Sequence, residues 1–264
     1  MHANAFDRYH AGKSLIHQLD PRVKLVITVL FILSNVLLPD GAWVGFLLSW
    51  GLILLFNHLS RVGLGYTFKR SFIAIPFALA GLTAIFALPG KPIGAWTIGP
   101  WHLTATDAGL VRFASILIRS WLSVQMAILL VGTTQFPDLM HALHHLRMPR
   151  VLVAIISFMY RYLFVLTDEA IRLMRAREAR SARVTSSKSG GPLAWRAQVA
   201  GNMAGQLFLR SYERSDRIYN AMLARGYTGQ LLTLNPHEMH TGDWLLGTLG
   251  IILLLLVQGI GRII

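Results

Sequence analysis

Two apolar stretches separated by a short turn decide the fold class: residues 23–38, VKLVITVLFILSNVLL, and residues 42–57, AWVGFLLSWGLILLFN. The turn is Pro39-Asp40-Gly41, a combination that favours a tight reversal of the chain. A helix of this length covers roughly 25 Å at about 1.5 Å per residue, which is slightly short of a hydrocarbon core of about 30 Å. We therefore expect a membrane-spanning helical hairpin whose flanking residues complete each span.

Three further apolar runs extend this pattern. They lie at about 71–88, 113–132 and 244–260. Asp20-Pro21 stands directly before the first run and is a favourable helix start. The sequence therefore predicts an all-α integral membrane protein with about five transmembrane helices.

The composition supports a membrane protein and excludes several other classes. Of 264 residues, 54% are hydrophobic and 14% are charged, and the mean hydropathy is +0.51. Disorder requires low hydrophobicity, and the absence of cysteine excludes a disulfide-stapled domain. The formal net charge of +13 would suggest nucleic acid in a soluble protein. Here basic cytoplasmic loops explain it, and we expect no nucleic-acid partner.

Basic residues also predict the orientation. They gather in the N-terminal segment and in residues 58–70, so both are expected on the cytoplasmic side of the cell membrane. The loop 89–110 is then outside, residues 134–242 are inside, and the C-terminus is outside. Arg112 and Arg119 fall on the outer side, where we expect them to reach the membrane surface or to pair with a partner in the bundle; a role in a substrate path is the alternative.

The apolar stretch 151–166 is ambiguous. If it crossed the membrane, the arginine-rich segment 168–242 would lie outside, and Arg161 would lie within the membrane. We expect instead a helix that begins at the membrane and leaves it, running from about 150 to 183. A linker rich in Ser and Gly follows, and then a second helix from about 193 to 225, which ends at Gly226.

This predicts three parts. Residues 1–133 contain the N-terminal segment and the first four spans. Residues 134–228 form a cytoplasmic module with the two long helices, and residues 229–264 contain a linker and the last span. The second long helix is amphipathic, with an apolar face and an opposite basic face. The apolar face contains Phe208, Tyr212, Ser215, Tyr219 and Met222, and the basic face contains Arg210, Arg214 and Arg217.

Two triplets stand near the ends of these helices: Ala179-Arg180-Ser181 and Ala224-Arg225-Gly226. Small residues beside an arginine let another backbone approach while the guanidinium group reaches for acceptors. The alternatives are a solvated basic face and attraction to anionic lipid. Further motifs are Leu19-Asp20-Pro21-Arg22-x-Lys24-Leu25, Phe136-Pro137-Asp138-Leu139, Met148-Pro149-Arg150, Met159-Tyr160-Arg161-Tyr162-Leu163 and Glu169-Ala170-x-Arg172-x-Met174-Arg175-Ala176-Arg177.

Together these motifs, over residues 6–228, resemble the transmembrane T component of energy-coupling-factor (ECF) transporters, in particular the Q-type subunit of the cobalt/nickel branch. The resemblance implies two crossed helices that sit in grooves of two ABC-type ATPase subunits. Arg180 and Arg225 would contact those grooves, and Arg177, Arg183 and Arg214 are further interface candidates. ATP and Mg²⁺ would bind the ATPases, whose closure would tilt a separate substrate-binding membrane subunit. Ser181 departs from the glycine that is common in this branch.

The chain itself shows no catalytic pattern. Gly12-Lys13-Ser14 resembles the end of a P-loop, but the required earlier glycine is replaced by Asp7. His141, His144 and His145 share a helix face, and we interpret them as a solvated or interface helix rather than a metal site. We expect a non-enzymatic chain with no cofactor and no metal of its own.

Three alternatives remain. A T component of this kind could serve a vitamin-binding subunit, although the Q-like motifs favour cobalt or nickel. A stand-alone permease is disfavoured because the predicted spans lack acidic residues and no inverted repeat is evident. A membrane enzyme acting on lipids would need polar catalytic clusters at the spans, and none is apparent.

Overall fold

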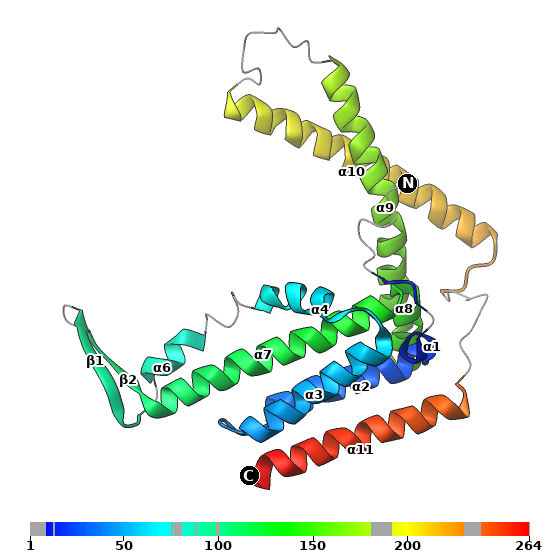
Figure 1. The fold of residues 1–264 in the computed structure, drawn as a ribbon. Coiled ribbons are helices and arrows are strands. Elements are labelled where there is room, and N and C mark those ends of the chain that lie inside the picture. Colours follow the sequence, from blue (N-terminus) through cyan, green and yellow to red (C-terminus); the bar gives the residue numbers. More distant parts are fainter. Residues whose placement is uncertain are drawn as a thin grey trace. The chain divides into compact units, whose positions relative to one another are not determined.

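The computed structural model describes residues 9–12, 14–74, 76, 81–87, 89–98, 101–180, 192–229 and 239–263. The chain divides into two compact units. The two-helix unit contains α9 (Arg150–Arg180) and α10 (Leu193–Ala224), and the bundle contains all other described elements (Figure 1). Each unit is described by itself below.

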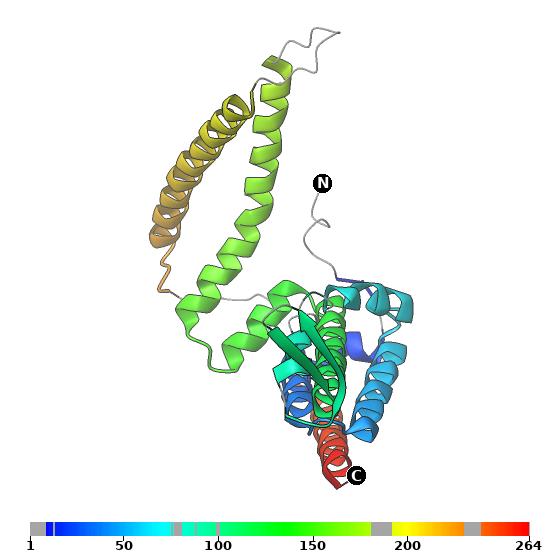
Figure 2. The ribbon, with the colours of Figure 1, turned by 90° about the vertical axis from the view of Figure 1, so that its left-hand side faces the viewer.

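The bundle is built on α2 (Pro21–Leu37), α3 (Trp43–Ser60), α7 (Asp107–Thr133) and α11 (Thr241–Ile263). Helix α2 packs against both α7 and α11, and α3 packs against the same two helices (Figures 1 and 2). The core lies between them and includes Phe31, Ile53 and Leu122, which are each 1% exposed. Many large apolar side chains on the outer faces are exposed, as expected for helices surrounded by lipid.

Four predicted spans, 23–38, 42–57, 113–132 and 244–260, coincide with these four helices, the first two extending one residue beyond α2 and α3. Three of the helices, α3, α7 and α11, are long and apolar enough to cross a membrane, as is α9 in the two-helix unit. Helix α2 has 17 residues. The chain is therefore a multi-pass membrane protein. That α9 leaves the membrane into the cytoplasm stays a prediction.

Contacts between helix ends give the direction of each helix. Helices α2 and α11 begin at the same end of the bundle, because the amide of Asp20 donates to the carboxylate of Asp243 at 3.1 Å. We call this the junction end, and we call the end with the turn between α2 and α3 the turn end. Helix α7 also ends at the junction end, since Lys24 Nζ lies 3.3 Å from the carbonyl oxygen of Thr133. At the opposite turn end, the α2–α3 turn meets the first half of α7 through Gly41, whose amide donates to Ser115 at 3.0 Å. Helices α2 and α11 are thus parallel, and α3 and α7 run the other way.

The predicted third span, 71–88, is not one continuous helix in the part that the structure describes, which corrects the sequence prediction. Among the described residues, α4 (Leu64–Ser71) is followed by short 3₁₀ turns, η2 (Phe72–Ala74) and η3 (Gly81–Thr83), and by α6 (Ala84–Ala87). Pro76 explains part of this, because proline lacks the amide donor that a helix interior needs. Described residues near both ends of this segment contact α7 or its N-cap. The indole of Trp121 donates to the Ser71 hydroxyl, and the hydroxyl of Thr106 donates to the carbonyl of Ile85.

The predicted outer loop contains an antiparallel hairpin of β1 (Pro92–Ile98) and β2 (Trp101–Thr106). The sequence analysis missed it, although Gly99-Pro100 between two runs with β-branched and aromatic residues is a hairpin signal. Helix α7 also begins earlier than its apolar run, because the Thr106 side chain caps it by accepting from the amide of Gly109 at 3.2 Å. The remaining elements, α1 (Leu15–Gln18) and α8 (Phe136–His145), lie at the junction end.

Candidate coupling surface

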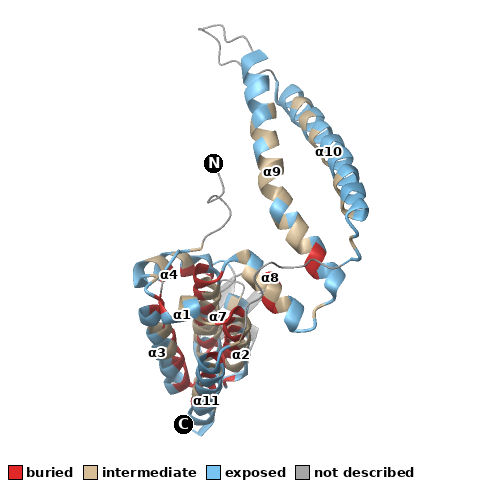
Figure 3. Cartoon of the chain, turned by 90° about the vertical axis from the view of Figure 1, so that its right-hand side faces the viewer, coloured by how far each residue is buried: buried red, intermediate tan, exposed pale blue. Residues whose placement is uncertain are grey.

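The two long helices match the predicted ranges closely. Helix α9 covers Arg150–Arg180, and α10 covers Leu193–Ala224. The boundaries that we predicted for the three parts of the chain stay a prediction about its membrane organisation. Figure 3 shows how little of this unit is buried: none of the residues of α10 is buried, and in α9 only Val153 and Ala154 are.

Helix α10 carries an exposed aromatic face, as its spacing predicts. Phe208 is 69% exposed, Tyr212 61% and Tyr219 54%. A β-carbon added at Gly201 or at Gly205 would have no neighbour within 4 Å, so this face is also open at its glycines. Contiguous exposed apolar surface of this kind marks a site of contact with lipid or with another protein.

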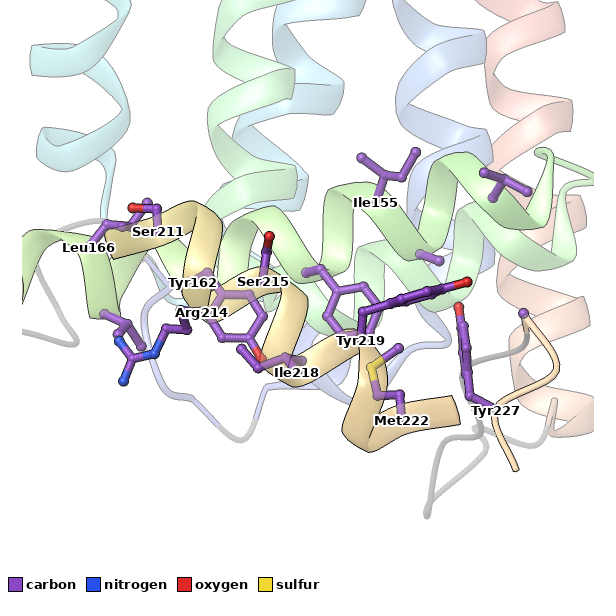
Figure 4. Close-up of a pocket in the computed structure, with 15 residues that line it drawn as sticks. Ile155, Tyr162, Leu166, Ser211, Arg214, Ser215, Ile218, Tyr219, Met222 and Tyr227 are labelled. Carbon is purple, nitrogen blue, oxygen red and sulfur yellow. The ribbon is translucent and has the colours of Figure 1, made fainter. Parts of the chain in front are cut away.

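The two helices are joined by an ion pair and leave a groove beside it. Glu169 of α9 pairs with Arg210 of α10, and Arg172 lies 3.8 Å from the same carboxylate. The groove has a volume of about 510 Å³ and is mostly apolar. Side chains from both helices converge on it in Figure 4, among them Ile155, Tyr162, Ile218, Tyr219 and Met222.

The candidate Arg214 also lines this groove. The sequence analysis placed Arg214 opposite the apolar face, whereas the structure places it among the residues that line the groove. No carboxylate of the described residues is within ion-pair distance of Arg214. Its charge is therefore available to a partner that covers the groove.

The first triplet ends α9. Ala179 and Arg180 are the last two residues of the helix and are exposed, as is Arg177 one turn earlier. Ser181 and Arg183 lie outside the described residues. The groove is lined by α9 residues from Val151 to Leu166, so Arg180 lies more than a dozen residues beyond it along the same helix. The structure therefore does not bring Arg180 into the groove with Arg214.

The second triplet forms the C-terminal cap of α10. The amide of Tyr227 donates to the carbonyl of Met222 at 3.0 Å, and the amide of Gly226 donates to Leu223 at 3.0 Å. This is the Schellman pattern, which needs a residue of positive φ just after the helix. Gly226 has φ +80° and fulfils that need. The glycine of the triplet thus has a role in the backbone of the cap, and the arginine, Arg225, is exposed at the end of the helix.

Sequence reasoning singled out Arg210 only as part of a basic face and missed its partner Glu169. The pair joins residues 41 positions apart, so no local pattern shows it. The three histidines of α8 lie near one another, with ring centroids of His141 and His145 4.4 Å apart. Across the described ranges, however, no group of three or more His, Cys, Asp or Glu side chains could hold a metal ion.

Comparison with known proteins gives one family. A family model described as cobalt transport protein, CbiQ, matches residues 12–237. An uncharacterized protein of Methanocaldococcus jannaschii is 30% identical over 243 residues, which is 90% of this chain and 80% of that protein. The energy-coupling factor transporter transmembrane protein EcfT of Brevibacillus brevis is 29% identical, covering 97% of both chains. The cobalt transport protein CbiQ of Salmonella typhimurium is 28% identical over 84% of this chain and 96% of its own length.

Proposed function

Because this chain belongs to the CbiQ family of cobalt transport proteins, which includes transmembrane components of ECF transporters, we propose that it is the coupling subunit of an ATP-driven importer. In this role it hydrolyses no ATP. It binds two ABC-type ATPase subunits, which hold ATP and Mg²⁺, and passes their motion to a substrate-binding membrane subunit. It lies in the cytoplasmic membrane with its N-terminus and the two-helix unit on the cytoplasmic side.

The observation that carries this proposal is how exposed the two-helix unit is. Each long helix ends with an exposed arginine, Arg180 or Arg225, and α10 has no buried residue at all. A pair of helices with so little burial gains its stability from partners rather than from its own core. The arginines suit carboxylates or helix-end carbonyls of the ATPases. The aromatic face and the groove suit an apolar partner, the substrate-binding subunit.

Co-purification in detergent tests the ATPase contact. Wild type, Arg180→Glu, Arg225→Glu and the double variant are each expressed with the ATPase, and insertion and monodispersity are checked. Removing one partner of a buried charge-assisted contact costs about 2–5 kcal/mol, so each single variant should bind less ATPase and the double variant none. Arg217→Glu, an exposed arginine of α10 outside the triplets, is the matched control and should bind normally.

Equal ATPase recovery with all variants would exclude these arginines as the contacts. If wild type itself bound no ATPase, the coupling role would be wrong, and a stand-alone permease would become the better interpretation. Reconstitution separates these two functions, because a stand-alone permease moves substrate without any ATPase.

We propose cobalt or nickel ions as the transported substrate. The family description and the Salmonella relative both name cobalt transport, which supports this choice. A vitamin is the second candidate, because several relatives are named only as energy-coupling factor transporter proteins. Two uptake measurements decide between them. One follows radiolabelled Co²⁺ and Ni²⁺ in the assembled transporter, and the other follows vitamins in transporters assembled with vitamin-binding subunits.

A further inference from the structure

One carboxylate caps two helices at the junction end of the bundle. Asp243 is the third residue of α11, and its Oδ2 accepts from the amide of His240, the residue before that helix, at 2.9 Å. This is the return bond of a capping box. Its Oδ1 accepts from the amide of Asp20 at 3.1 Å. Asp20 in turn is the N-cap of α2 and accepts from the amide of Arg22 at 2.8 Å.

A buried lysine at the same place holds the ends of two other elements. Lys24 is 7% exposed, and its Nζ donates to the carbonyls of His17 at 3.0 Å and of Thr133 at 3.3 Å. Thr133 is the last residue of α7. Burial acts against the ammonium charge of Lys24, and the negative charges of Asp138, Asp20 and Asp243 partly offset that cost. Asp138 lies in the first turn of α8, which packs against α2.

The charges in this cluster offset one another. Asp20 and Asp243 are 3% and 8% exposed, and a buried carboxylate is costly without compensation. Both carboxylates here lie at helix N-termini, where the helix dipoles favour negative charge. Lys24 adds a full positive charge. The cluster is therefore a polar network in which hydrogen bonds reach every one of the three side chains, although one carboxylate oxygen of Asp20 accepts none. Such a network rigidifies the backbone segments it joins.

These segments are where the two-helix unit is attached to the bundle. The chain passes from α7 through α8 into α9, and it returns from α10 to α11. The boundaries between the units lie after Leu146 and before Asn235. One attachment thus follows the end of α7, which Lys24 holds. The other precedes the start of α11, which Asp243 holds to Asp20.

We propose that Asp20, Lys24 and Asp243 form an anchor that joins both attachments of the two-helix unit to the first turn of α2, and that this anchor delivers the force of the coupling helices to the membrane helices. The inference rests on the proposed coupling function for its second half. It also gives a physical role to the sequence motif Leu19-Asp20-Pro21-Arg22-x-Lys24-Leu25. Without the anchor, the start of α11 would detach from the start of α2. Each residue freed in this way would lengthen the connection between α10 and α11 by up to about 3.5 Å.

The first test measures the anchor in the isolated chain and is independent of any ATPase. Hydrogen–deuterium exchange is followed in peptides covering residues 19–24 and 239–244. Asp243→Asn keeps the shape of the side chain but removes its charge and one acceptor. Exchange in both peptides should rise about tenfold, as expected when a charge-assisted hydrogen bond is lost. Asp107→Asn, which changes an exposed carboxylate in the first turn of α7, is the matched control and should leave both peptides unchanged.

The second test measures coupling in the assembled transporter. Asp243→Asn and Lys24→Met should still co-purify with the ATPase and support ATP hydrolysis. Uptake of Co²⁺ per ATP hydrolysed should fall severalfold in both variants. Lys69→Met, at an exposed lysine of α4, should retain the wild-type ratio. This ratio is informative because a loss of stability alone would lower hydrolysis and uptake together.

Different failures have different meanings. Unchanged exchange in Asp243→Asn would overturn the anchor itself. Faster exchange with an unchanged ratio of Co²⁺ uptake to ATP hydrolysis would overturn the role of the anchor in force transfer. A variant that loses both the anchor and ATPase binding would overturn that role as well. If wild type bound no ATPase, the coupling function would fall and the force-transfer role with it, while the exchange result would still decide whether the anchor exists.

Discussion

Arg119, in the middle of α7, holds Asp40 in the turn between α2 and α3. Its Nη2 lies 2.9 Å from the Asp40 carboxylate and donates to the carbonyl of Leu38, the C-cap residue of α2, at 2.5 Å. The carbonyl of Arg119 accepts from Asn35 at 3.0 Å. The sequence offered membrane-surface contact or a partner in the bundle for this arginine, and the second was correct. One side chain thereby fixes the turn of the first hairpin against α7.

Arg119→Met should destabilise the bundle. It removes the donors but keeps the aliphatic stem, and it leaves the buried Leu38 without a partner for its carbonyl. The loss should be about 1–3 kcal/mol, seen as a lower thermal unfolding midpoint in detergent. Arg112→Met is the control, because Arg112 is half exposed and 3.9 Å from Asp40. A surface pair of this kind contributes at most about 1 kcal/mol. Equal losses in both variants would contradict the role of Arg119 in closing the turn.

Gly109→Ala should also destabilise the bundle, for a steric reason. A β-carbon at this position would lie 2.5 Å from the carbonyl oxygen of Ile85 and 2.8 Å from its Cα. These are backbone atoms and cannot rotate away, so a cost of about 1–3 kcal/mol is expected. At Gly51, in α3, an added β-carbon meets nothing within 4 Å. Gly51→Ala should therefore be neutral or stabilising. The two unfolding midpoints, compared with wild type, check this contrast.

Gly226→Ala should loosen the end of α10. The left-handed backbone at φ +80° costs a residue with a β-carbon roughly 1–2 kcal/mol. The amides of Gly226 and Tyr227 should then exchange with solvent faster. Gly226→Asn should show a smaller effect, because asparagine tolerates this conformation better. Gly205→Ala, inside the same helix and without neighbours, should leave the cap intact. Wild-type exchange in Gly226→Ala would show that the cap is not needed.

His17 should make the N-terminal segment sensitive to pH. Its Nε2 lies 2.8 Å from the carbonyl of His10, and its Nδ1 lies 2.6 Å from the Ser14 hydroxyl. A carbonyl only accepts, so Nε2 carries the proton and the neutral ring can accept at Nδ1. Burial, and to a smaller extent the nearby charges of Lys24 and His10, lower the pKa of His17 below its usual value of 6.5, while the bond to His10 acts in the other direction.

The unfolded segment then binds more protons than the folded one as pH falls through 6.5. The stabilisation is therefore complete above about pH 6.5 and declines below it. Amide exchange of residues 14–18 should be faster at pH 5.5 than at pH 7.5 after correction for the intrinsic rate. His17→Gln, which does not titrate, should remove this dependence. A dependence that persists in His17→Gln would have another source.

The sequence by itself determined what depends on neighbouring residues. Four long apolar runs predicted the four main helices of the bundle, and Asp20-Pro21 and Gly226 placed a helix start and a helix end where the structure has them. The two long helices were predicted within a few residues. Their amphipathic pattern and the terminal triplets were also readable, because helical periodicity and capping act over one or two turns.

Only the tertiary structure decided how distant segments meet. Asp20 and Asp243 are 223 positions apart, and Asn35 and Arg119 are 84 positions apart, so no periodicity links them. Helix α6 likewise packs against α7, a contact that no local pattern in the sequence shows. A buried polar group needs a partner, but the sequence alone does not say which one. Because α2 packs against both α7 and α11, Asp20, Lys24 and Asp243 come together in the anchor.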